Sequence, residues 1–161
     1  MINWFADSEN MLVKMISNNR KSLIDTNQIV PDGPTISTNF GEKAQNRTYQ
    51  DLLKNKFDEH NFEQLSTSAI FKVSIDGSVK KWMDDGMYRT ISFSPNGEYV
   101  MISQINKPFS YLVTYSRFPT ETNVYSKDGN FISNLLNVPL IEELPKGFMS
   151  SMLLNPSSYC S

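Results

Sequence analysis

Few side chains in this chain have the type and the setting for chemistry, and Arg117 is the most suggestive of them. It lies in residues 106–121 among four aromatic residues, Phe109, Tyr111, Tyr115 and Phe118. A guanidinium group can hold a carboxylate through two parallel hydrogen bonds, so Arg117 is a candidate binding residue. Lys107, in the same segment, is a weaker candidate. The alternative for Arg117 is structural, with its side chain bonded to backbone carbonyls or to a carboxylate of a neighbouring strand.

A catalytic centre is not visible in the sequence. A nucleophile elbow requires the pattern G-x-S-x-G, and none of the seven glycines lies in such a pattern. The one histidine, His60, lies between Glu59 and Asn61, and a triad in the order Ser, Asp, His would have to fit into the residues before it. We therefore expect His60 to be a solvated surface residue, and we predict no catalytic residue in this chain.

Metal and cofactor sites are not predicted either. The sequence contains no phosphate-binding glycine loop and no H-E-x-x-H pattern. Cys160 is the one cysteine, which excludes an intrachain disulfide and any metal site built from several cysteines.

The overall composition excludes two classes of partner. A formal charge of −2 over 161 residues gives no basic field of the kind that nucleic acid requires. No apolar run approaches the ~18 residues of a transmembrane helix, and residues 1–7 lack the layout of a signal peptide. We predict no nucleic-acid partner and no membrane segment, and the compartment stays open.

The strongest structural pattern runs from Arg89 to Leu136 and predicts four short strands in two hairpins. Apolar residues alternate with polar ones around Ile91, which is typical of a half-buried strand. The segments Ser94–Gly97 and Ser126–Gly129 carry Asn-Gly and Asp-Gly pairs, which favour tight hairpins through positive φ values. Four antiparallel strands in one small sheet are typical of one blade of a β-propeller.

A second copy of this pattern lies upstream. Residues 71–82, with Asp76-Gly77, match the second hairpin, whose glycine follows Gly77 by 52 residues. Residues 4–13 match residues 92–101 more loosely. A repeat near this length is typical of propeller blades. We predict an all-β fold, a partial β-propeller of about two four-stranded blades over residues 1–149 with a short helical insertion.

Two insertions interrupt the predicted blades at equivalent places, one over residues 17–68 and the other over residues 106–121. The first contains a polar connector and then Thr48-Tyr49-Gln50-Asp51, which has the form of a helix capping box. We expect one helix from Tyr49 to about Lys56 and a second helical turn from Phe57 to Gln64, with Phe62 and Leu65 pointing inward. This helical part either packs against a blade edge or forms an arm over the propeller face or into a neighbouring domain.

A propeller ring needs typically about 4 to 8 blades, which is more than this chain holds. Because blades bury their faces against neighbouring blades, two blades alone leave apolar faces and strand edges open. We therefore expect the chain to be a piece of a longer protein. Residues 150–161 form a tail without the strand pattern.

Several segments resemble one family of enzymes. They are residues 32–34, 41–55, 107–113, 115–119 and 138–140, with Glu142-Glu143. They are similar to the prolyl oligopeptidase family of serine peptidases, in the branch of glutamyl endopeptidases, and the resemblance covers about residues 4–149. It implies an N-terminal propeller that screens access to a C-terminal α/β-hydrolase domain, which carries the Ser, Asp and His. That domain is absent from this chain, and no catalytic residue of the family matches a position here.

Two functions follow from these predictions. The first is the non-catalytic propeller segment of a serine peptidase, which gates or recognises peptide substrates, with Arg117 and Lys107 as candidate substrate-binding residues. Its partners would be the missing hydrolase domain and a peptide, and the chain alone would be inactive. The second is a free-standing interaction module that completes its sheet by oligomerising or by adding strands to a partner.

Overall fold

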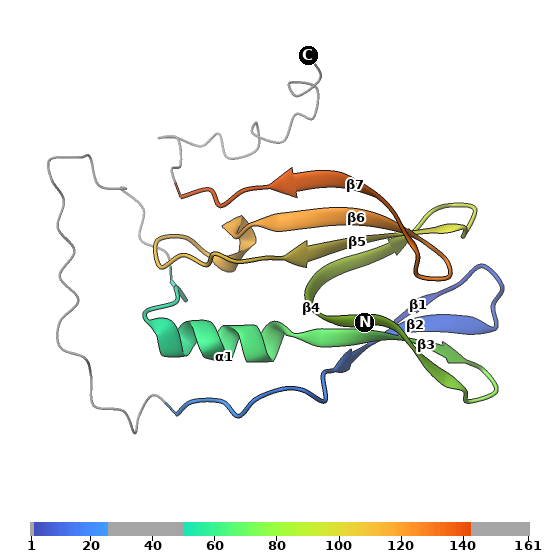
Figure 1. The fold of residues 1–161 in the computed structure, drawn as a ribbon, viewed down its shortest axis with the longest axis horizontal. Helices are drawn as coiled ribbons and strands as arrows, with labels where there is room; N and C mark the ends of the chain where they lie inside the picture. Colours follow the sequence, from blue (N-terminus) through green and yellow to red (C-terminus); the bar gives the residue numbers. More distant parts are fainter. Residues whose placement is uncertain (1, 26–49, 143–161) are drawn as a thin grey trace, which may run out of the picture.

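The computed structural model describes residues 2–25 and 50–142, which form one curled antiparallel sheet with a single α-helix (Figure 1). Its seven strands lie in sequence order, so that each strand pairs with the next. The strands are β1 (Ile2–Trp4), β2 (Asn10–Ile16), β3 (Ser68–Ser74), β4 (Val79–Phe93), β5 (Tyr99–Ile105), β6 (Thr120–Ser126) and β7 (Phe131–Val138). The helix α1 (Lys56–Ser66) precedes β3, and a short 3₁₀ helix, η2 (Tyr115–Arg117), precedes β6.

The long strand β4 joins two four-stranded sections of the sheet. Its first part, to Gly86, pairs with β3, and its second part, from Met87, pairs with β5. We call β1, β2, β3 and Val79–Gly86 the first section, and Met87–Phe93, β5, β6 and β7 the second section. In Figure 1 β4 passes from one section to the other with a sharp bend. The mostly β fold with one short helix is as predicted, and the sheet runs on through β4 as one curled unit.

Gly86 marks the place where β4 leaves the first section. It pairs with Ser68 at one end of a register shift in the β3–β4 ladder. A Cβ atom at this position would lie 2.8 Å from Cζ of the Tyr88 ring, which is closer than real contacts allow. Tyr88 is itself buried, and its hydroxyl donates a hydrogen bond to the Asp84 carbonyl at 2.6 Å. The bend therefore depends on a residue without a side chain.

Three hairpins use the same turn, as the sequence pattern predicts. In Ser74–Gly77, Ser94–Gly97 and Ser126–Gly129 the glycine N–H donates to the serine carbonyl at 2.9 Å. The glycines have φ of 88°, 72° and 90°, which only glycine adopts at little cost. The expectation of positive φ at Asn96 as well is wrong, because among described residues only Ser8 and Asp51 share this conformation with the glycines.

The main core lies between the two sections. Leu12 and Ile70 come from the first section and Val100 and Ile102 from the second, and all four are almost completely buried. Phe5, Tyr88 and Ile91 complete this cluster. Alternation along β5 places Met101 on the opposite face, where it is 40% exposed. The curled sheet therefore buries one face of each section.

A second cluster joins the two insertions. Phe62 of α1 contacts the rings of Phe109, Tyr115 and Phe118, with centroid distances of 5.2, 6.3 and 5.7 Å. Ile105, Val113 and Phe118 are its buried centre. The helix and the aromatic segment thus lie at the same end of the sheet and bury each other.

The helix does not begin where the sequence pattern placed it. Residues 50–55 are not helical, and Asp51 has a φ of 61°, so the predicted helix from Tyr49 to Lys56 is wrong over its described part; Thr48 and Tyr49 lie outside the described residues. Asn55 caps α1 instead, because its Oδ1 accepts hydrogen bonds from the N–H groups of Phe57 and Asp58, each at 2.9 Å.

The predicted second helical turn is present within α1. Phe62 packs into the second cluster as expected, but Leu65 is 58% exposed, so its predicted inward direction is wrong. The tail over residues 150–161 and the later part of the predicted connector, from residue 26 on, lie outside the described residues.

Candidate functional site

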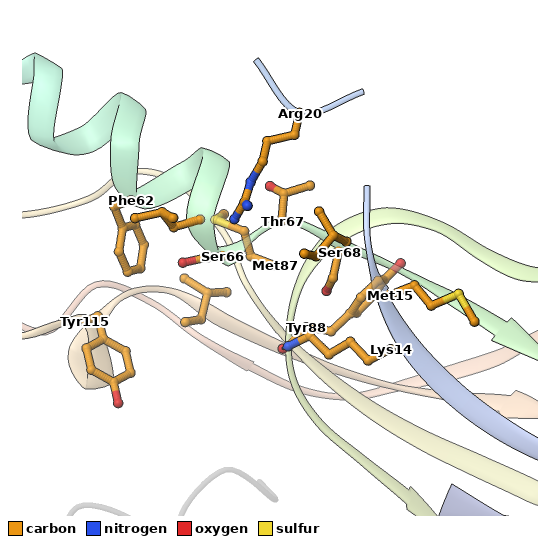
Figure 2. A pocket seen from close by; sticks show the side chains of 13 residues that line it. Lys14, Met15, Arg20, Phe62, Ser66, Thr67, Ser68, Met87, Tyr88 and Tyr115 are labelled. Carbon is orange, nitrogen blue, oxygen red and sulfur yellow. The ribbon is translucent and has the colours of Figure 1, made fainter. Parts of the chain in front are cut away.

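A hollow in the described structure lies where α1, β2 and the bend of β4 meet (Figure 2). It is a pocket of about 540 Å³. Its polar wall includes Lys14, Arg20 and Ser68, and its apolar wall is formed by Phe62, Leu65, Met87, Ile105 and Tyr115.

Lys14 is on β2 and points across the sheet to the bend. Its Nζ donates a hydrogen bond to the carbonyl oxygen of Tyr88. Burial lowers the pKa of Lys14 below its ordinary value of 10.5, because an ammonium group loses part of its hydration there. Among the described acidic residues, none forms a salt bridge with Lys14.

Arg20 follows β2 and ties the chain to the end of α1. Its Nε donates to the Gln64 carbonyl at 2.6 Å, a favourable position for a cation because the last carbonyls of a helix carry partial negative charge. The next residues run along the helix, where Ile24 exchanges two hydrogen bonds of 2.8 Å with the Asn61 side chain. Figure 2 shows the guanidinium of Arg20 directed toward Thr67 at the pocket rim.

Ser68 is the first residue of β3 and lines the pocket. Its residue is 6% exposed, and its Oγ is buried without a hydrogen-bond partner in the described structure. A buried hydroxyl without a partner costs about 1–3 kcal/mol, so such groups are uncommon in folded proteins. Ser68 pairs in the ladder with Gly86 on one side and Ile16 on the other.

The charged side chains that line the pocket are all positive. Two cationic side chains line it, and no aspartate or glutamate does. Acidic groups elsewhere on these elements have other partners. Asp85 accepts hydrogen bonds from Ser17 Oγ at 2.6 Å and Asn19 Nδ2 at 2.8 Å. Glu63 forms a salt bridge with Lys107 at 2.8 Å. The pocket therefore offers donors and positive charge, which suits an anionic group.

The predicted binding residues lie outside this pocket. Arg117 is half-buried in η2, and its backbone bonds to Thr114 and Ile141, whereas its side chain forms no salt bridge with a described acidic residue. Lys107 pairs with Glu63 and lies 5.8 Å from the centroid of the Phe109 ring. Tyr115, two residues before Arg117, does line the pocket.

Lys14, Arg20 and Ser68 could not be grouped from the sequence alone. They are spread over more than fifty positions, and no motif contains them. Only the pairing of β2 with β3, together with the hydrogen bonds from the connector to α1, brings them to one pocket.

A second, smaller hollow lies between the hairpin ends of the two sections, with a volume of about 300 Å³. Four lysines line it, but three are already engaged: Lys81 pairs with Asp84 at 2.7 Å, Lys127 pairs with Glu98 at 3.1 Å, and Lys72 lies over the Phe5 ring at 4.8 Å. Hydrogen bonding to Asp84 raises the pKa of Lys81. This hollow is therefore the weaker site.

Other chemistry is limited in the part of the chain that the structure describes. The ring nitrogen Nε2 of His60 lies 3.1 Å from the Ser22 carbonyl, so this histidine helps to hold the connector on α1. No group of three or more metal-ligating side chains occurs among residues 2–25 and 50–142. Within the same ranges, no helix has the length and apolar character needed to cross a membrane.

Comparison with known proteins gives two relatives. A probable chloroplastic glutamyl endopeptidase of Oryza sativa subsp. japonica is 41% identical over 117 residues, which are 72% of this chain and 12% of the rice protein. A probable chloroplastic glutamyl endopeptidase of Arabidopsis thaliana is 33% identical over 142 residues, which are 88% of this chain and 15% of that protein. The chain is thus homologous to a small part of these proteins. No family model and no solved structure matches it.

Proposed function

We propose that this chain is a non-catalytic, propeller-forming segment of a serine peptidase related to the glutamyl endopeptidases, and that it gates or recognises peptide substrates. The observation that carries this proposal is the 41% identity over 117 residues with a protein of that name. The matched part is 12% of the rice protein, so the remaining length of such a protein is available for a catalytic domain.

The shape of the sheet supports the propeller part of the proposal. The two sections each have four antiparallel strands, which is the composition of a blade. The outer face of the second section carries the apolar residues Tyr99, Met101 and Leu136, which are between 40% and 47% exposed. A neighbouring blade is the element that covers such a face in a propeller.

A segment exchange tests this function. The matching segment of the rice relative is replaced by this chain, and cleavage of a glutamate-containing peptide is measured. We expect the exchanged protein to retain turnover, the same protein with the segment deleted to lose it, and the isolated chain to show none. Turnover by the isolated chain, or an exchanged protein that folds but is inactive, would contradict the proposal.

Arg117 is proposed as a substrate-recognition residue within this function, with Lys107 as the weaker candidate. The side chain of Arg117 has no salt-bridge partner among the described acidic residues, whereas Lys107 already pairs with Glu63. In the exchanged protein, Arg117→Ala should raise KM for the glutamate-containing peptide more than Lys107→Ala does. Unchanged KM and kcat in Arg117→Ala would leave a scaffold role only.

The open edges favour a second candidate function, a free-standing interaction module. β1 and β7 are the two ends of the strand order, and β7 exposes Phe131, Ile132, Leu135 and Leu136. Exposed, apolar edge strands recruit further strands from a partner or from another copy. A defined oligomer that unfolds cooperatively would favour this function.

A further inference from the structure

We propose that the pocket between α1, β2 and the bend of β4 binds the carboxylate group of a peptide, with Lys14, Arg20 and Ser68 as its donors. This inference rests on the proposed function only for its choice of a peptide as the ligand. The choice of an anion comes from the pocket itself, which two cations and no carboxylate line.

The two cations keep free donors after their structural hydrogen bonds are counted. Arg20 uses Nε for the Gln64 carbonyl, and its two terminal nitrogens form no hydrogen bond or salt bridge with the described residues. Lys14 uses one of its three N–H donors for the Tyr88 carbonyl. A carboxylate has about four lone-pair positions and is matched by donors that approach from different sides.

Ser68 gives an independent reason to expect a ligand. Its hydroxyl is buried at the pocket, and it lacks a partner in the described structure. The oxygen atom has almost no accessible surface, so a bound carboxylate would satisfy this hydroxyl once rotation about χ1 turns it into the pocket. A purely structural role for Lys14 and Arg20 explains their bonds to Tyr88 and Gln64 but leaves Ser68 unexplained.

The apolar wall indicates what accompanies the carboxylate. Phe62, Met87 and Ile105 also belong to the cluster that joins the insertions, so this wall is held in place by the fold. Tyr115 and Leu65 are 57% and 58% exposed and line the same pocket. A volume of about 540 Å³ accommodates more than a bare carboxylate, and an apolar residue next to the acidic group would contact this wall.

Binding of three acetylated tetrapeptides to the 161-residue chain tests the proposal by calorimetry. The first is Ala-Leu-Ala-Phe with a free C-terminal carboxylate, the second is Ala-Leu-Glu-Phe amide, and the third is the neutral Ala-Leu-Ala-Phe amide. We expect at least one acidic peptide to bind about tenfold more tightly than the neutral one. The preferred acidic peptide identifies the source of the carboxylate, the chain terminus or a glutamate side chain.

Substitutions of the lining residues test whether the peptide binds in this pocket. Arg20→Gln and Lys14→Met should each weaken binding of the preferred peptide by about tenfold, and Ser68→Ala should weaken it without any change of charge. Lys21→Gln is the matched control, because it removes the same charge next to Arg20 from a side chain that does not line the pocket. Circular dichroism and urea midpoints establish that each variant is folded. If Arg20→Gln unfolds, binding by Lys14→Met and Ser68→Ala is compared with that of the original chain instead.

Three results would overturn the proposal. These are equal binding of the neutral and acidic peptides, no binding of any peptide at millimolar concentration, and an equal effect of Lys21→Gln and Arg20→Gln. Each of these concerns the pocket alone. The segment exchange with the rice relative would still succeed in each case if the proposed function is correct, so the two failures are distinguishable.

Discussion

At the scale of single residues, Glu121 holds the base of the aromatic insertion. Its carboxylate accepts hydrogen bonds from Asn123 at 3.0 Å and from Asn106 at 3.1 Å, with Gln104 and Asn134 at 3.4 Å. Asn106 begins the insertion and Glu121 ends it, so this carboxylate joins the two ends. The hydrogen bonds from Asn123 and Asn106 are the main causes that lower the pKa of Glu121 below 4.5.

This lowered pKa predicts a pH-dependent loss in Glu121→Gln. The folded chain stabilises the charged carboxylate, so the contribution of Glu121 to stability is present above pH 4.5 and is lost as pH falls through its lowered pKa. Urea midpoints of the two proteins should therefore differ near neutral pH and converge on the acidic side. Asp128→Asn, on an exposed turn, is the control. A difference in urea midpoint that stays constant from neutral to acidic pH would contradict the prediction.

Residue identity alone could not have shown the candidate pocket. Arg117 is conspicuous in the sequence because aromatic residues surround it, whereas Lys14 and Arg20 are ordinary cations in a strand and a polar connector. Their significance depends on the absence of acidic residues around them in space, which involves β2, β3, β4 and α1 together. Nothing local in the sequence encodes that arrangement.

At the scale of elements, the hairpins were predictable and the helix start was not. Each of the three hairpins that turn at a glycine places its signal within four residues, and that glycine adopts positive φ. Two segments fit a helix start, Thr48 to Asp51 and Asn55 to Asp58, because each begins with a capping residue and has an acid three residues later. Packing of Phe62 against the aromatic insertion favours the second, and that contact lies outside the local pattern.

The cap of α1 can be tested directly. Asn55→Ala removes the acceptor of two backbone N–H groups and should lower the free energy of unfolding by about 1 kcal/mol. Asn55→Asp keeps the acceptor and should stay close to the original stability. The measurement is urea unfolding followed by circular dichroism. Equal losses in both variants would show that the cap is not the cause.

The bend of β4 gives a sharper test. Gly86→Ala places Cβ 2.8 Å from the Tyr88 ring, and a buried ring cannot move freely, so we expect a loss of about 1–3 kcal/mol in the free energy of unfolding. Combining Gly86→Ala with Tyr88→Leu removes the contacted ring atoms. The effect of Gly86→Ala should then be clearly smaller in the Tyr88→Leu background than in the original chain, and equal effects in both would rule out this contact as the cause.

At the scale of the whole molecule, the curled sheet buries one face of each section, and among the described residues no further strand pairs with the outer edges of β1 and β7. The second section exposes Tyr99 and Met101 from β5 and Leu136 from β7, and the pairing of Thr122 with Leu136 and of Ser103 with Thr122 places these residues on one face. These exposed apolar side chains share this face with the polar residues Ser103 and Thr122, and Leu136 lies on β7, the last strand of the described sheet. The isolated chain therefore has a surface that stabilises contact with other molecules.

We expect the isolated chain to associate in solution and Leu136→Lys to reduce that association. A lysine at position 136 replaces an exposed apolar side chain on the outer face with a charged one, while the main core between the sections is unchanged. Size-exclusion chromatography with light scattering measures the mass, and circular dichroism confirms that the variant is folded. A broad mass distribution for the original chain supports a segment that needs the rest of a larger protein, whereas a single defined oligomer supports the interaction module. A stable monomer at high concentration, unaffected by Leu136→Lys, would contradict both functions. Each of them requires that another molecule, or another part of a larger protein, covers this face.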